Sequence, residues 1–176
     1  MRQQGYAATG WRQVISESGT PWGSQAHHFP DGKEQLAAEA IELSGRQYEA
    51  TLRSVLETGH PADAVTAWTD VAAAALERAG WADGCPIATI TLETAHTSDR
   101  LAAACATALD SWRCALAEAM QRNGASPPDA DELATLVLAS TEGALLMARA
   151  ARSPEPLHIV GRQLHGLLRT RLPSRP

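Results

Sequence analysis

The 176-residue sequence predicts an all-α protein of one or two small domains. Alanine is abundant and β-branched residues do not cluster, a composition that favours helices. Apolar residues recur three and four positions apart in several long stretches, as they do on one face of a helix. Residues 88–93 alternate apolar and polar side chains as a strand does, but nothing else alternates to supply a pairing strand. The local pattern leaves this one segment open between helix and strand.

Two short helices are predicted near the N-terminus, between Thr9 and His28. Thr9 suits the N-cap of the first helix, and Gly19 stands where a helix ends in a left-handed conformation. Pro21 suits the first turn of the second helix, over 22–28, and Pro30 follows its end. Two short helices joined by a tight turn predict a helix-turn-helix.

A longer helix is predicted over 33–57, about 37 Å long at 1.5 Å per residue. Its apolar face comprises Leu36, Ala40, Ile41, Tyr48, Leu52, Val55 and Leu56. On this pattern it is either a plain packing helix or a connector between the two ends of the molecule. Gly59 breaks it, and Pro61 opens the next helix, which ends at Gly80.

Three further helices are predicted in the second half of the chain. Ser98 caps a helix that runs to about residue 122. Asp129 and Glu132 form a capping-box-like start for a helix that runs to about residue 152. A last helix follows the prolines at 154 and 156, and Pro173 ends it.

The last two of these helices are apolar over a wide arc. One stripe comprises Leu133, Leu136, Val137, Ser140, Ala144 and Met147. Ala139 and Gly143 would let another helix come near. Because the stripes exceed what one face of a small bundle needs, pairing with a second copy of the chain is favoured over their use inside one monomer.

Charge and cysteine content narrow the class of protein. The formal charge is −5, and residues 1–57 carry five basic and seven acidic side chains. This balance argues against a general polyanion binder, but not against a protein that contacts DNA through a small local surface. Cys85, Cys105 and Cys114 have no metal-binding spacing, and no disulfide framework is expected. With no signal peptide or long apolar span, the chain is expected in the cytoplasm and not in a membrane.

No group of residues indicates catalysis. His27 and His28 are adjacent and are therefore expected to point apart, whereas His158 and His165 are seven positions apart and can share a helix face. Neither pair has a carboxylate at a metal-ligand spacing. The sequence therefore predicts no catalytic residue, no metal and no cofactor.

Three runs, GYAAT, RQVISESGTPWGS and HHFPDGKEQLAAEAI, resemble the DNA-binding end of the TetR family of one-component transcriptional regulators. The positions that stand in the family's order are Gly5, Tyr6, Thr9, Ile15, Gly19, Gly23, Ser24, His28, Phe29, Lys33 and Leu36. The extra glycine in FPDGKEQL, with GCPIATITLE and EGALLMARA further on, resembles the LmrA/YxaF-like branch, and the resemblance covers almost the whole chain. It implies a helix-turn-helix domain over 1–45, a ligand-binding and dimerisation domain over 46–176, and a short helix after Pro86.

The chain also departs from the family's pattern. Relatives have a full helix before the glycine–tyrosine pair, where this chain has only residues 1–4, so the helix-turn-helix is expected to be truncated at its N-terminus. Gln25 and Ala26 stand where the family usually has an apolar residue and a tyrosine, and Trp22 where it often has a basic residue. The alternative for the second helix is a degraded, solvent-exposed segment.

The resemblance implies contacts with a double-stranded DNA operator. The candidates are Thr9, Arg12, Trp22, Ser24, Gln25, His27, His28 and Lys33. Ser24, Gln25 and His27 are expected to face the groove, and Thr9 and Lys33 to touch the DNA backbone at helix N-termini.

The resemblance also implies a small apolar or aromatic effector. The candidates for the wall of its site are Trp68, Leu92, Cys105, Leu109, Trp112 and Met147. Tryptophan, methionine and cysteine suit a planar apolar guest. Plain core packing is the alternative for each of the six.

The resulting interpretation is a non-enzymatic regulator, a homodimer through its two C-terminal helices, that leaves its operator when the effector binds. The first alternative is a dimeric small-molecule-binding module that has lost DNA binding. The second is a small helical enzyme, which would require a pair of titratable groups in the effector site.

Overall fold

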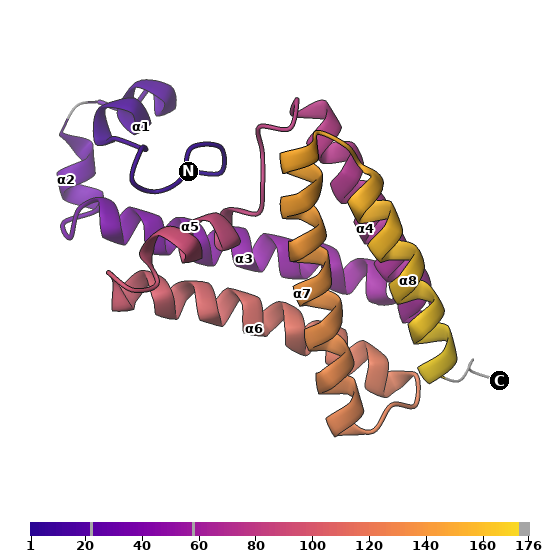
Figure 1. The fold of residues 1–176 in the computed structure, drawn as a ribbon. Helices are drawn as coiled ribbons and strands as arrows, with labels where there is room; N and C mark the ends of the chain where they lie inside the picture. Colours follow the sequence, from indigo (N-terminus) through magenta and orange to yellow (C-terminus); the bar gives the residue numbers. More distant parts are fainter. Residues whose placement is uncertain (22, 58, 173–176) are drawn as a thin grey trace. The chain divides into compact units, whose positions relative to one another are not determined.

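The computed structural model describes residues 1–21, 23–57 and 59–172, and of residues 25 and 26 it gives the backbone alone. Within these ranges the regular elements are helices, with no strand (Figure 1). They are α1 (Trp11–Ser18), α2 (Ser24–His28), α3 (Lys33–Glu57), α4 (Pro61–Arg78), α5 (Pro86–Thr94), α6 (Asp99–Arg122), α7 (Pro127–Ala151) and α8 (Glu155–Arg171). The all-α prediction is confirmed, and the alternating segment after Pro86 is helical.

The start of α1 differs from the prediction. Gly10 is the N-cap, and no side chain caps the helix. Thr9 is buried, and its hydroxyl donates to the carbonyl oxygen of Gly5 at 2.7 Å. The prediction that Thr9 caps this helix is wrong, because its hydroxyl closes the preceding turn. The predicted end is correct, since Gly19 adopts the left-handed conformation with φ +66°.

The start of α7 also differs. Its N-cap is Ser126, whose hydroxyl accepts from the Asp129 amide at 3.3 Å and donates to the Asp129 carboxylate at 2.6 Å. The predicted pair of Asp129 and Glu132 is wrong because the two prolines at 127 and 128 already occupy the first helical turn. Ser98 caps α6 as predicted, accepting from the Leu101 amide at 3.1 Å.

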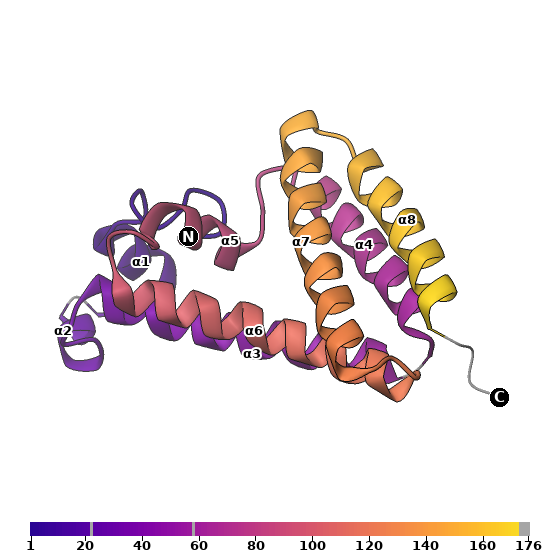
Figure 2. The ribbon, with the colours of Figure 1, turned by 60° about the horizontal axis from the view of Figure 1, so that its bottom comes forward.

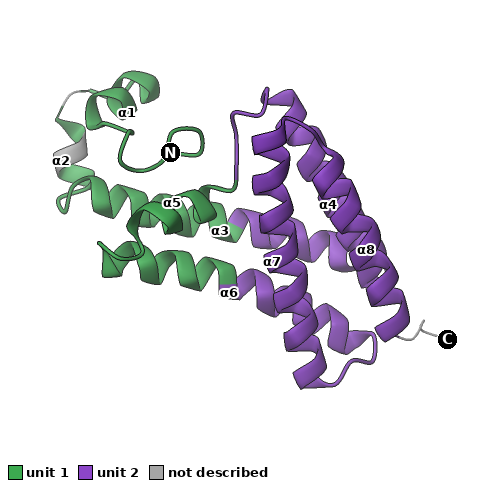
Figure 3. Cartoon of the chain, viewed as in Figure 1, with its two compact units in different colours: residues 1–46, 85–109 green, residues 47–84, 110–176 purple. Residues whose placement is uncertain are grey.

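The chain forms two compact units, coloured separately in Figure 3. Unit 1 comprises residues 1–46 and 85–109, and unit 2 comprises residues 47–84 and 110–176. The long helices α3 and α6 each contribute to both units. The boundary after residue 45, which separates a DNA-binding from a ligand-binding domain, stays a prediction.

The core of unit 1 is built from small and aliphatic side chains of α1, α3, α5 and α6. Its buried members include Ile15, Ala37, Ala38, Ile41, Ile87, Ile90, Leu101, Cys105 and Ala108. Short α1 is attached to this core mainly by Ile15, the buried residue of that helix.

Unit 2 is organised around α4, α7 and α8, which lie side by side (Figures 1 and 2). Its buried side chains include Leu52, Leu56, Val65, Trp68, Leu76, Trp112, Leu116, Met120, Leu133, Val137, Leu157, Leu164 and Leu168. The backbones of α8 and α4 approach closely at Gly161, where an added Cβ would lie 2.3 Å from Thr69 Oγ1. Glycine at this position therefore sets how close the two helices lie.

We predict that Gly161→Ala lowers the free energy of unfolding by about 1–2 kcal/mol, because the added methyl group must push α8 away from Thr69. Gly166→Ala is the matched control on the same helix, since a Cβ there meets nothing within 4 Å. The control should be neutral or stabilising by up to about 1 kcal/mol. Urea unfolding of both variants tests this, and equal stabilities would contradict the proposed close approach.

Candidate nucleic-acid interface and effector site

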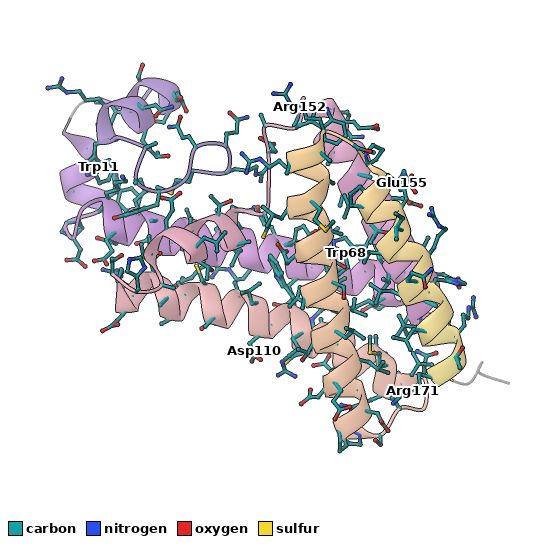
Figure 4. All side chains as sticks on the ribbon, in the orientation of Figure 1. Trp11, Trp68, Asp110, Arg152, Glu155 and Arg171 are labelled. Carbon is teal, nitrogen blue, oxygen red and sulfur yellow. The ribbon has the colours of Figure 1, made fainter. Side chains whose placement is uncertain are left out.

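The helix-turn-helix segment, residues 11–28, is the first part of the candidate site. The turn after α1 is fixed by Gly19 and by a 2.8 Å hydrogen bond between the hydroxyls of Ser18 and Thr20. The rings of Trp11 and Phe29, 6.2 Å apart, bring the two ends of the segment together. Figure 4 labels Trp11 within this part of unit 1. Among the described side chains of this segment only Ile15 is buried, so the segment has little hydrophobic core of its own.

The structure places the predicted DNA-contacting residues in different environments. Arg12, His27 and His28 are exposed, whereas Thr9 is buried. Ser24 is half-buried, and its hydroxyl donates to the carbonyl oxygen of Pro21 at 2.9 Å. Trp22 lies outside the described residues, and so does the side chain of Gln25.

The two adjacent histidines do not point apart. The rings of His27 and His28 meet edge to face with their centroids 5.1 Å apart. The expectation from adjacency is wrong here because α2 is only a short helix, so that rotation about the side-chain bonds brings the rings together. Together they form an exposed polar surface at the C-terminal end of α2.

Lys33 begins α3 beside the N-terminal turn. Its ammonium lies 4.3 Å from the centre of the Tyr6 ring and donates to the carbonyl oxygen of Ala7 at 3.3 Å. Burial raises the pKa of the Tyr6 hydroxyl, and the carboxylate of Glu34 raises it further. The positive charge of Lys33 is therefore held against residues 6 and 7.

Residues between 93 and 100 also make polar contacts with this part of unit 1. The amide of Ala7 donates to the Glu93 carboxylate at 2.8 Å. Arg100 forms an ion pair with Asp31 at 3.0 Å, and the Ser98 hydroxyl donates to Glu34. No local pattern in the sequence indicates the role of Glu93, because its partner lies 86 positions away.

In unit 2 the structure brings two predicted effector residues, Trp68 and Trp112, together around Tyr48. The Tyr48 ring lies 4.6 Å from Trp112 and 6.0 Å from Trp68, measured between centroids. The indole N–H of Trp68, labelled in Figure 4, donates to the Tyr48 hydroxyl. Trp112 is buried, but Tyr48 keeps 39% of its surface exposed. Tyr48 was missed as a candidate, although its place on the apolar face of the 33–57 helix was the signal available.

The other four effector candidates differ widely in exposure. In unit 1, Cys105 is buried and its thiol faces the Ile87 carbonyl oxygen at 3.8 Å. Burial raises the pKa of this thiol, which keeps it protonated. Leu109 is half-buried, while Leu92 and, in unit 2, Met147 are exposed.

One face of α7 is buried in unit 2, and the opposite face exposes an apolar stripe. The stripe comprises Leu136, Ala139, Gly143, Leu146, Met147 and Ala150. Ile159 of α8 is exposed as well. Among the described helices, α7 is long and apolar enough to cross a membrane, judged by length and composition only. Its buried face packs in the core of unit 2, so its apolar character also serves that core.

The C-terminal histidines pair with carboxylates of α4. His165 lies 3.1 Å and Arg169 2.7 Å from Asp63, and His158 lies 3.8 Å from Asp70. The sequence did not reveal these partners because they lie on another helix. Among the described residues no group of three or more His, Cys, Asp or Glu side chains could hold a metal ion.

Residues 61–163 match the family model of the C-terminal domain of LmrA/YxaF-like transcriptional regulators. The HTH-type transcriptional regulator YxaF of Bacillus subtilis is 32% identical, over 94% of this chain and 87% of its own length. The HTH-type transcriptional regulator LmrA of Bacillus subtilis is 34% identical, over 88% of this chain and 82% of its own length.

Solved structures share the fold. The regulatory protein TetR from Rhodobacter sphaeroides superposes with a TM-score of 0.83 at 23% identity, covering 94% of this chain and 90% of that one. Reduced NemR of Escherichia coli gives a TM-score of 0.77 at 20% identity, covering 98% of this chain and 91% of that one.

We predict that the Asp63 contact stabilises the protein at neutral pH and not in strong acid. Burial alone would raise the pKa of Asp63, but hydrogen bonds from Arg169 and His165 bring it below its usual value. A lowered pKa stabilises the folded state above the ordinary aspartate pKa of about 4, and this is lost as the pH falls through the folded value. Asp63→Asn should therefore lower the Tm at pH 7, and the difference from the unmodified protein should close toward pH 2. Glu77→Gln, which removes an exposed carboxylate from the same helix, is the control; an Asp63→Asn effect that is independent of pH would refute the ionic explanation.

Proposed function

The chain belongs to the LmrA/YxaF-like branch of the TetR family of transcriptional regulators, and on that basis we propose that it is a homodimeric repressor that a small apolar or aromatic molecule releases from its operator. The observation that carries the proposal is that one chain contains both a helix-turn-helix, α1 and α2, and a long helix, α7, that exposes an apolar stripe. As a regulator of genomic DNA it acts in the cytoplasm.

The DNA-binding surface is formed by the exposed side of α1 and α2. Arg12, His27 and His28 offer donors to phosphates and base edges, and Ser24 fixes the turn between the helices. Trp22 and Gln25 are further candidate contacts by the family resemblance alone, since neither side chain is among those described. Lys33, at the start of α3, adds a positive charge beside this surface, whereas Thr9 is buried and closes the preceding turn. The net charge of −5 makes this local concentration of donors important for affinity.

The homodimer is formed by α7 and α8. Two copies that pair through the exposed stripe bury Leu136, Leu146 and Met147, while Ala139 and Gly143 allow the helices to approach closely. Pairing gives the dimer two helix-turn-helix segments, which must match DNA half-sites roughly 34 Å apart. This arrangement also explains why a helix of a DNA-binding protein carries so much exposed apolar surface.

The effector binds where aromatic side chains are already gathered. Tyr48 is exposed on one side and backed by Trp68 and Trp112, so a planar molecule can stack on the cluster and use the Tyr48 hydroxyl as a polar contact. This site does not include Leu92, Cys105 and Leu109, which belong to unit 1, or Met147, which we assign to the dimer face. The effector binds more tightly to the DNA-free arrangement of the two helix-turn-helix segments than to the DNA-bound one. It therefore lowers the affinity for DNA, and bound DNA lowers the affinity for the effector by the same factor.

We predict that Arg12→Ala and His27→Ala each weaken DNA binding by on the order of tenfold, because each removes a donor from the reading surface. Binding is measured by fluorescence anisotropy at low salt on a duplex from the region immediately upstream of the gene. Arg78→Ala, at the exposed end of α4, is the control for loss of one positive charge and should leave the affinity unchanged.

A second outcome of this measurement would favour a different function. Gln25 and Ala26 replace the usual apolar and tyrosine residues of the second helix, which is the sequence observation in favour of a dimeric effector-binding module without DNA binding. A stable dimer of the unmodified protein that binds neither its upstream DNA nor unrelated duplexes would support that module and contradict the repressor.

We predict that Leu146→Glu and Met147→Glu convert the dimer to a monomer, because each places an unpaired charge in a desolvated interface. Both side chains are more than 60% exposed in the single chain, so neither change disturbs the core of unit 2. Val71→Glu is the matched control, since Val71 of α4 is 64% exposed but lies on another helix. Analytical ultracentrifugation measures the state of assembly; persistence of the dimer in both variants, or its loss in Val71→Glu, would contradict the assignment of the stripe.

A further inference from the structure

The end of α5 and the start of α6 form a corner, residues 93–100, which within unit 1 contacts the turn before the helix-turn-helix segment and the chain just after it. The carboxylate of Glu93 accepts a hydrogen bond from the Ala7 amide at 2.8 Å. The same carboxylate occupies the space beside Gly5, where an added Cβ would lie 1.6 Å from Glu93 Oε1. Gly5 also has φ +81°, which other residues rarely adopt. Gly5 and Glu93 are thus matched to one another across 88 positions of sequence.

Two more contacts from this corner reach the beginning of α3. Arg100 pairs with Asp31 at 3.0 Å, and the Ser98 hydroxyl donates to the Glu34 carboxylate. Between these two acidic residues, Lys33 extends back to the Tyr6 ring and the Ala7 carbonyl oxygen. Residues 6 and 7 are therefore held by Lys33, while Glu93 holds the Ala7 amide.

Apolar burial contributes little to fixing this turn. Residues 2–4, 7 and 8 are exposed, and the turn is closed internally by hydrogen bonds such as Thr9 Oγ1 to the Gly5 carbonyl oxygen at 2.7 Å. Hydrogen bonds to a charged acceptor are stronger than those between neutral groups. Where few apolar contacts exist, a charged acceptor on a backbone amide has a large influence on local order.

We propose that Glu93 is a positioning residue for the DNA-reading segment: its carboxylate fixes residues 5–7, and so the approach to α1, from the end of α5. The inference rests on the proposed function. The buried residues Ile87 and Ile90 fix α5 in the core of unit 1, so the Glu93 carboxylate has a fixed position beside the Ala7 amide. Operator affinity then depends on an acidic side chain that makes no contact with DNA.

The test is the rate of amide hydrogen exchange at Ala7, measured by NMR on the full chain without DNA. Glu93→Ala should speed exchange at Ala7 roughly 3- to 10-fold, because the amide loses its charged acceptor. Glu93→Gln keeps a neutral acceptor and should give a smaller increase. Gly5→Ala displaces the same carboxylate and also strains the backbone at φ +81°, so it should speed exchange at Ala7 at least as much as Glu93→Ala. Glu77→Ala, an exposed carboxylate of α4, should leave Ala7 unchanged.

A purely structural role of Glu93 would show as lowered global stability, so urea unfolding is measured in parallel and should change little. Unchanged Ala7 exchange in Glu93→Ala would overturn the proposal. DNA affinity separates this proposal from the proposed function. If the unmodified protein binds its upstream duplex, Glu93→Ala should bind it several-fold more weakly, and equal affinity would overturn the positioning role. If the unmodified protein does not bind DNA, the repressor function fails, and the exchange data alone decide whether Glu93 orders residues 5–7.

Discussion

Close approach of helices at small residues is the constraint on which the rest of this structure depends. In unit 2, α8 lies directly against α4 because Gly161 leaves room for Thr69. In unit 1, buried alanines of α3 and α6 accompany a few aliphatic side chains such as Ile41 and Leu101. Small side chains bury little apolar area each, so stability must come from the large number of close contacts along long helices. Long, rigid helices in turn give fixed positions to the few polar groups that matter for function.

The reading segment illustrates how such fixed positions are used. Helices α1 and α2 are too short to be stable alone, and Ile15 is the buried residue of α1. Their placement relies on Trp11 against Phe29 and on polar contacts that Glu93, Ser98 and other residues of unit 1 make with the surrounding turns. A segment held mainly by polar contacts is easily shifted, which is consistent with the proposed release from the operator.

The two faces of α7 differ in burial although both are apolar. Leu133 and Val137 are buried in unit 2, while Leu146 and Met147 of the same helix are exposed. A helix that is apolar on both faces needs a second partner, and a second copy of the chain is the partner we propose. The aromatic cluster around Tyr48 belongs to the same unit, so the proposed effector site and the proposed dimer face share one helical framework.

The sequence by itself determined the helical class, the bounds of the long helix 33–57, and the family, because these depend on local periodicity and on residues at fixed spacing. It also determined the left-handed end of α1 at Gly19, a property of one residue. The structure corrected two local predictions, since Thr9 closes a turn and Ser126 caps α7. Only the tertiary structure decided that Tyr48 joins two tryptophans. The pairing of Glu93 with Gly5 and Ala7, and of His165 with Asp63, could not be foreseen. The physical reason is that a hydrogen bond or ring contact between distant residues leaves no periodic trace in either segment, and arises only when packing brings the two helices or turns together.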